Sequence, residues 1–165
     1  MPALYPNYYF IGALLTLLFL IYVTFLLIKI PDRSPASTHL AIGMIFTGLF
    51  NLAYVVSHGF YELPTYITRL INFYTPMGAA LHLVVFFRSF PTIRSPRTIR
   101  IILIAGHTII LLVMVYLALE MARSPLYYLI NSHFWDSDSL PAQKYVSVVI
   151  LLSFLHFTGT GLWRG

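Results

Sequence analysis

Five apolar stretches, each long enough to cross a lipid bilayer as a helix, dominate this sequence. They are roughly 18 to 24 residues long, and at about 1.5 Å per residue such helices match a hydrocarbon core about 30 Å thick. The spans are expected at residues 8–30, 40–61, 67–90, 101–121 and 146–163. Because 59% of residues are hydrophobic and only 9% charged, a water-soluble domain would lack a polar surface. The sequence therefore predicts an all-α, polytopic membrane helix bundle that forms a single transmembrane domain over residues 1–165.

The connections between the spans carry residues that stop or start helices. Pro31 and Pro35 lie in the first connection and cannot continue the first helix, and Thr38 or Ser37 is expected to cap the second. The long connection Ala122–Tyr145 is rich in aromatic residues, which suits a segment lying at the membrane surface.

The distribution of basic residues predicts the orientation. Seven of the ten Lys and Arg residues fall on the side of the first and third connections and of the chain end: Lys29, Arg33, Arg88, Arg94, Arg97, Arg100 and Arg164. Since basic residues mark the cytoplasmic side, the N-terminus is expected outside and the C-terminus in the cytoplasm. The net charge of +5 is thus interpreted as membrane topology, and no nucleic-acid partner is expected. The chain stops directly after its fifth span, which suggests a longer protein or assembly with partners.

Polar and small residues recur at helical spacing within three of the spans. These stripes are Gly43, Thr47, Asn51, Tyr54 and His58; Asn72, Thr75, Ala79 and His82; and Ser153, His156 and Thr160. They can serve as helix-packing seams, or they can line a buried cavity for a ligand, proton or ion. Pro76 favours a cavity, because a proline frees a backbone carbonyl inside the helix. The candidates for a ligand site or polar core are Asn51, His58, Asn72, Thr75 and His82.

Three histidines lie at similar depth in different spans. His82, His107 and His156 are each roughly 10 to 12 Å from the cytoplasmic boundary at about 1.5 Å per residue. Imidazoles at matched depth are candidate ligands for haem or a transition metal. The alternative is that each histidine bonds a neighbouring carbonyl or hydroxyl group. The cofactor is therefore left open between none, haem and a transition metal.

Enzyme motifs for hydrolysis, phosphate binding or metalloprotease chemistry are absent, and the chain has no cysteine. We expect no catalytic residue in this segment. Glu120 is expected to reach the headgroup layer and to pair with Arg123, three residues further on.

Three segments carry a resemblance to a known group of proteins: Arg33–Leu40, Phe50–Tyr54 and Ala80–Pro91. They resemble the membrane-embedded N-terminal region of multi-pass bacterial signalling proteins. The resemblance implies a seven-helix sensor module, N-terminus outside, that precedes a cytoplasmic histidine kinase, nucleotide cyclase, diguanylate cyclase or serine phosphatase domain. This chain offers five spans and no effector, which implies either truncation or a different small family.

The resemblance leads us to expect a sensor in the bacterial inner membrane that relays a ligand or membrane signal to a cytoplasmic output, with an effector domain or a second copy of the chain as its partner. One alternative is a haem- or metal-binding membrane subunit that uses the intramembrane histidines. Another is a small transporter or a subunit that assembles a larger complex.

Overall fold

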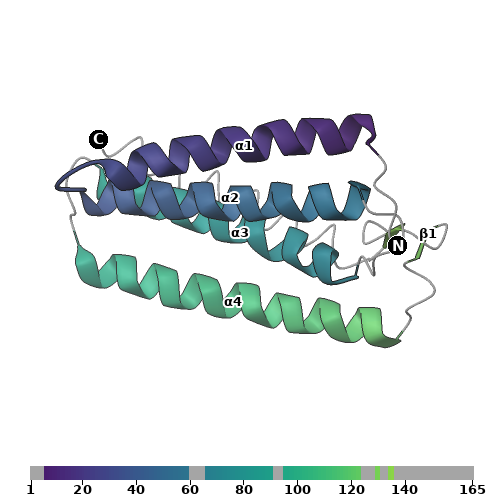
Figure 1. Ribbon diagram of the computed structural model, residues 1–165. Helices are drawn as coiled ribbons and strands as arrows, with labels where there is room; N and C mark the ends of the chain where they lie inside the picture. Colours follow the sequence, from purple (N-terminus) through teal and green to yellow (C-terminus); the bar gives the residue numbers. More distant parts are fainter. Residues whose placement is uncertain (1–5, 60–65, 91–94, 124–128, 131–133, 136–165) are drawn as a thin grey trace.

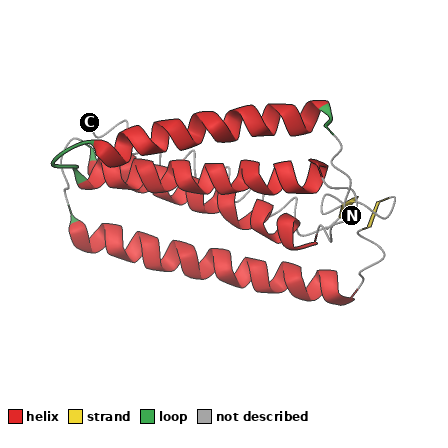
Figure 2. Ribbon diagram, viewed as in Figure 1, coloured by secondary structure: helices red, strands yellow, loops and turns green. Residues whose placement is uncertain are grey.

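The computed structural model is a bundle of long helices, and it describes residues 6–59, 66–90, 95–123, 129–130 and 134–135. Its helices are α1 (Tyr8–Lys29), α2 (Pro35–Gly59), α3 (Tyr66–Ser89) and α4 (Pro96–Arg123). Two short antiparallel strands, β1 (Leu129–Ile130) and β2 (Phe134–Trp135), follow α4 and pair Leu129 with Trp135 and Ile130 with Phe134. Figure 2 shows how little of the described chain lies outside the helices.

All four helices are long and apolar enough to cross a membrane, as befits an integral membrane protein. They correspond to the first four expected spans, and the helical fold class is confirmed for this part of the chain. The expected fifth span, 146–163, lies outside the described residues, as does most of the connection before it.

Two helices begin five residues before the expected spans, because each starts with the same serine-proline cap. The Ser34 hydroxyl accepts a hydrogen bond from the Ser37 N–H at 3.1 Å, and the Ser34 carbonyl accepts from the Thr38 N–H. Ser95 repeats this arrangement at the start of α4. Proline is favoured at the first helical position, where its missing N–H is not needed. The expectation that Ser37 or Thr38 caps α2 is therefore wrong, and Ser34 is the cap.

The helices pack in chain order, so that α2 and α3 lie between α1 and α4 (Figure 1). The α2–α3 contact is the most extensive, and α4 contacts α3 less extensively. Buried apolar side chains fill the seams, among them Ala41, Ala53, Val84, Val85 and Leu117. Large apolar side chains cover the outer faces of α1 and α4, where lipid would surround them.

Alternate connections bring the ends of the helices together. The end of α1, the start of α2, the end of α3 and the start of α4 share one end of the bundle, which we call the basic end (Figure 1). It carries Lys29, Arg33, Arg88, Arg97 and Arg100. Toward the opposite end, Glu120 and Arg123 form the expected ion pair at 2.9 Å, which confirms that prediction.

Candidate functional site

The α2–α3 seam is close because small residues face each other across it. Gly43 of α2 is buried, and a Cβ built there would lie 3.6 Å from the carbonyl oxygen of Ala79 and 3.8 Å from the Cβ of His82. Small residues at a helix interface let two backbones approach. The close approach at Gly43 places polar side chains of α2 within reach of His82.

His39 and His82 form a direct contact between α2 and α3. Their Nδ1 atoms are 3.0 Å apart, so one imidazole donates an N–H and the other accepts. The two ring centroids are 5.2 Å apart. His82 is 6% exposed, and His39 is half-buried. This contact satisfies one polar atom of each ring in a site where lipid offers no alternative partner.

Phe46 connects the histidine pair to two further aromatic side chains. Its ring stacks on the ring of His82 and meets the ring of Tyr74 edge-on, with 5.6 Å between centroids in both cases. The centroid of the His107 ring lies 6.2 Å away. Gly78 makes room for it, because a Cβ at that position would lie 2.9 Å from two carbons of the Phe46 ring. Tyr74 and His82 are four residues to either side of Gly78 on α3, so the ring fits between them.

His107 brings α4 into the same group of side chains. Its ring lies 5.6 Å from the ring of His82, and its Nδ1 is 3.4 Å from the Tyr74 hydroxyl. Gly106 permits the approach, since a Cβ there would lie 2.7 Å from both terminal methyl carbons of Leu81. We call His39, Phe46, Tyr74, His82 and His107 the histidine cluster. It joins three helices within the apolar part of the bundle.

A second group of polar residues lies on α3 before His82, on either side of Tyr74 in the sequence. Thr75 is 1% exposed, and its hydroxyl donates to the Ile71 carbonyl at 2.8 Å. Asn72 is 8% exposed, and neither atom of its amide has a hydrogen-bond partner among the described residues. Pro76 lacks the N–H that would bond to the carbonyl of Asn72 in an unbroken helix. The side-chain amide and the backbone carbonyl of Asn72 therefore place several polar atoms close together inside α3.

The remaining sequence candidates take less part in contacts between helices. The Asn51 amide donates to the Thr47 carbonyl at 2.9 Å, and the Thr47 hydroxyl donates to the Gly43 carbonyl at 3.0 Å, so both bonds stay within α2. His58 lies in α2, but its side chain is outside what the structure describes.

The predicted metal ligands are only partly brought together. His82 and His107 are neighbours, as their matched depth suggested, whereas His156 lies outside the described residues. Within the described ranges, no group of three or more histidine or acidic residues is arranged to hold a metal ion.

Three members of the histidine cluster, His39, Phe46 and Tyr74, were not selected from the sequence as site residues. Placing the start of the second span at residue 40 left His39 outside the membrane, and the serine-proline cap at Ser34 is the signal that includes it. Phe46 and Tyr74 depend on how α2 and α3 pack, which spacing along one helix does not reveal.

Comparison with known proteins adds no relative. No protein-family model, curated protein or solved structure matches this chain.

Proposed function

We propose that this chain is the membrane-embedded input module of a signalling protein, with the histidine cluster as its sensing element. The observation that carries the proposal is the continuous path of ring and hydrogen-bond contacts from His39 on α2 through His82 on α3 to His107 on α4. A ligand or a change in protonation that breaks these contacts changes how three helices pack.

The hydrogen bond between His39 and His82 suits a two-state contact. It requires one Nδ1 that carries a proton and one that does not. When both rings are charged, both Nδ1 atoms are donors and two like charges lie next to each other. A transition-metal ion on either Nδ1 also removes the bond. Either event therefore favours a second arrangement of α2 against α3.

The surroundings of His82 contain few groups that would compete for such a signal. Among the described residues, the titratable side chains that face His82 are His39 from α2 and His107 from α4. The Tyr74 hydroxyl lies within hydrogen-bond distance of His107. The stimulus is accordingly one that acts on imidazole.

The wider setting of the proposal is a five-span protein of the bacterial inner membrane, with the basic end in the cytoplasm. The cations at this end support that orientation. The helix ends nearest the histidine cluster would then adjoin a cytoplasmic effector domain or a second copy of the chain. In this proposal the segment itself transmits a change and catalyses nothing.

Distance measurements between spin labels test the proposal directly, because the chain has no native cysteine. Labels would be attached at Asp32→Cys, between α1 and α2, and at Arg97→Cys, at the start of α4. With the protein in lipid nanodiscs, the label separation is expected to change reversibly by about 2 Å or more between about pH 8 and about pH 4.

The same labels in a His82→Phe background provide the control, and there the pH-dependent change should disappear. Distance distributions that stay the same across this pH range, and also on addition of Zn²⁺ or Cu²⁺, would contradict a sensing role for the cluster.

A haem- or metal-binding subunit is the second candidate function, favoured by the 5.6 Å separation of the His82 and His107 rings. An absorption spectrum with metal analysis of the purified protein, beside His82→Ala, tests it. A Soret band or stoichiometric metal that the variant loses would favour the cofactor subunit over the sensor.

A further inference from the structure

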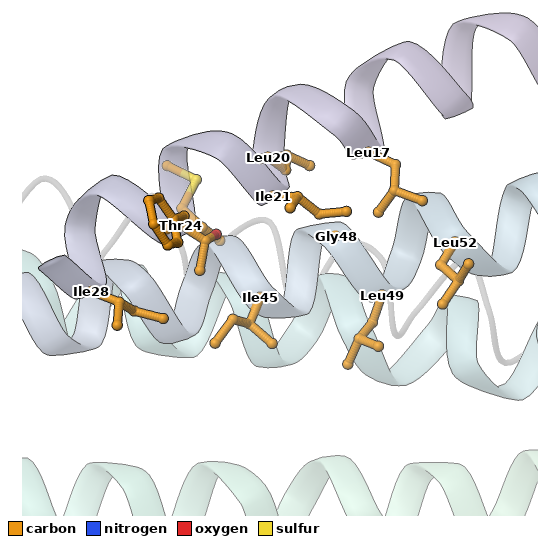
Figure 3. A pocket seen from close by; sticks show the side chains of 11 residues that line it. Leu17, Leu20, Ile21, Thr24, Ile28, Ile45, Gly48, Leu49 and Leu52 are labelled. Atoms are coloured by element: carbon orange, nitrogen blue, oxygen red, sulfur yellow. The ribbon is translucent and has the colours of Figure 1, made fainter.

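An apolar groove runs along the seam between α1 and α2, and no residue of the histidine cluster lines it. It has a volume of about 380 Å³, and its walls are α1 between Leu17 and Ile28 and α2 between Met44 and Leu52. Figure 3 shows Leu17, Ile28, Ile45 and Leu52 around it, with Gly48 on the α2 wall. Gly48 keeps that wall low, since a Cβ there would meet only Leu17, at 3.8 Å.

The groove is about as long as one leaflet of the hydrocarbon core is thick. Leu17 and Ile28 are eleven residues apart, which is about 16 Å along a helix, and half of a hydrocarbon core is about 15 Å. It occupies the half of α1 that leads to the basic end. An extended acyl chain of a lipid in that leaflet would fit along it.

Positive charge lies where the groove reaches the basic end. Lys29 directly follows the groove residue Ile28, and its Nζ lies 5.4 Å from the ring centre of Phe25, which also lines the groove. Arg33 follows in the exposed connection to α2. The described part of the basic end holds five cations against one carboxylate, Asp32. A negatively charged group is the complement of this end.

The geometry points to a binding site for one anionic phospholipid, with an acyl chain in the α1–α2 groove and its phosphate at Lys29 and Arg33. If only an acyl chain bound here, the cations beside the groove would have no role in binding. If the cations served only to set the membrane topology, they would not need a groove beside them. A phospholipid uses both features, because its chain and its phosphate are separated in the same way as the groove and the two cations. This site does not depend on the proposed sensing function.

Native mass spectrometry of the detergent-purified full chain tests the site. The protein would be stripped of lipid and titrated with dioleoyl phosphatidylglycerol or dioleoyl phosphatidylcholine. One phosphatidylglycerol is expected to bind well before any phosphatidylcholine. Removing both charges with Lys29→Gln and Arg33→Gln should weaken its binding roughly thirtyfold, because each cation near a membrane surface contributes about 1 kcal/mol.

Two pairs of variants separate the charge from the groove. Ile45→Trp fills the groove from a position that is 43% exposed and should also prevent binding, whereas Ile104→Trp, at a position on α4 that is 62% exposed, should not. Arg123→Gln, at the opposite end, is the control for charge.

Three outcomes would overturn the proposal. They are equal retention of both lipids, equal binding by Ile45→Trp and Ile104→Trp, and competition by glycerol 3-phosphate as strong as that by the whole lipid. The last would indicate a site for phosphate without an acyl chain.

Discussion

The Nδ1 atoms of His39 and His82 lie 3.0 Å apart, which links the second turn of α2 to a buried position on α3. Two helices that present only apolar atoms to each other can slide, because lipid tails are equally good neighbours. A hydrogen bond between two imidazoles, one on each helix, fixes the register of the two helices. The histidine pair is therefore a structural link between α2 and α3 and, in the proposed function, the contact that the stimulus breaks.

Replacing one partner of this pair should cost more than replacing both. In His82→Phe the His39 ring loses its partner, and we expect a loss of stability on the order of 1–2 kcal/mol, seen as a lower midpoint of thermal unfolding in detergent. His39→Phe/His82→Phe should recover part of that loss, because no imidazole is then left unpaired. Tyr116→Phe, at a half-exposed position on α4, is the control. Strictly additive losses would show that the two rings are not coupled.

Gly106 should be the position at which α4 is most sensitive to a single added methyl group. In Gly106→Ala the new Cβ meets the terminal methyl groups of Leu81, and we expect a loss of about 1 kcal/mol as this half-buried side chain turns aside. Gly12→Ala is the matched control, since nothing lies within 4 Å of its Cβ. Gly106→Ala/Leu81→Ala should recover stability. Equal unfolding midpoints for the two alanine variants would contradict the observed α3–α4 contact.

Gly78 should likewise be more sensitive than Gly43, although both glycines are buried in the α2–α3 seam. A Cβ at Gly78 meets the Phe46 ring at 2.9 Å, and the neighbouring rings of Tyr74 and His82 restrict its escape. Gly78→Ala should therefore lower stability by about 1–3 kcal/mol, whereas Gly43→Ala makes ordinary contacts and should change it by less. Thermal unfolding followed by circular dichroism measures both, and Phe46→Leu should rescue Gly78→Ala.

The serine-proline caps should each contribute measurable stability. Ser34→Ala and Ser95→Ala remove the hydroxyl that accepts from the first turn of α2 or α4, and each should cost about 1 kcal/mol. Ser57→Ala, which removes a hydroxyl bonded to the Tyr54 carbonyl inside α2, is the control and should have a smaller effect. Unfolding midpoints for Ser34→Ala and Ser57→Ala that agree would argue against a capping role.

The orientation can be tested with single cysteines in the otherwise cysteine-free chain. Asp32→Cys, at the basic end, should react with a membrane-impermeant maleimide only after the membrane is opened. Ala122→Cys, at the other end of α4, should react in intact cells. The reverse pattern would place the basic end outside and would contradict the orientation predicted from charge.

The length of the apolar stretches predicted the described spans, and helical spacing predicted the buried polar residues of α3. Asn72, Thr75 and His82 form a buried stripe on α3, as their spacing indicated, because each polar side chain avoids lipid. Depth along the membrane also placed His82 beside His107. Boundaries were harder: the small polar residues after Pro35 resemble a loop by composition, and only the hydrogen bonds of Ser34 show that α2 has already begun.

The connection between α1 and α2 has a mechanical consequence. It holds only the five residues 30–34, with Asp32 in the left-handed region at a φ of 52° and Ser34 fixed as a cap, so it contains almost no slack. A tilt of α1 in response to bilayer thickness must therefore be passed to the first turns of α2, where His39 lies. Because of this short connection, the α1–α2 hairpin couples the tilt of its outer helix to the position of His39.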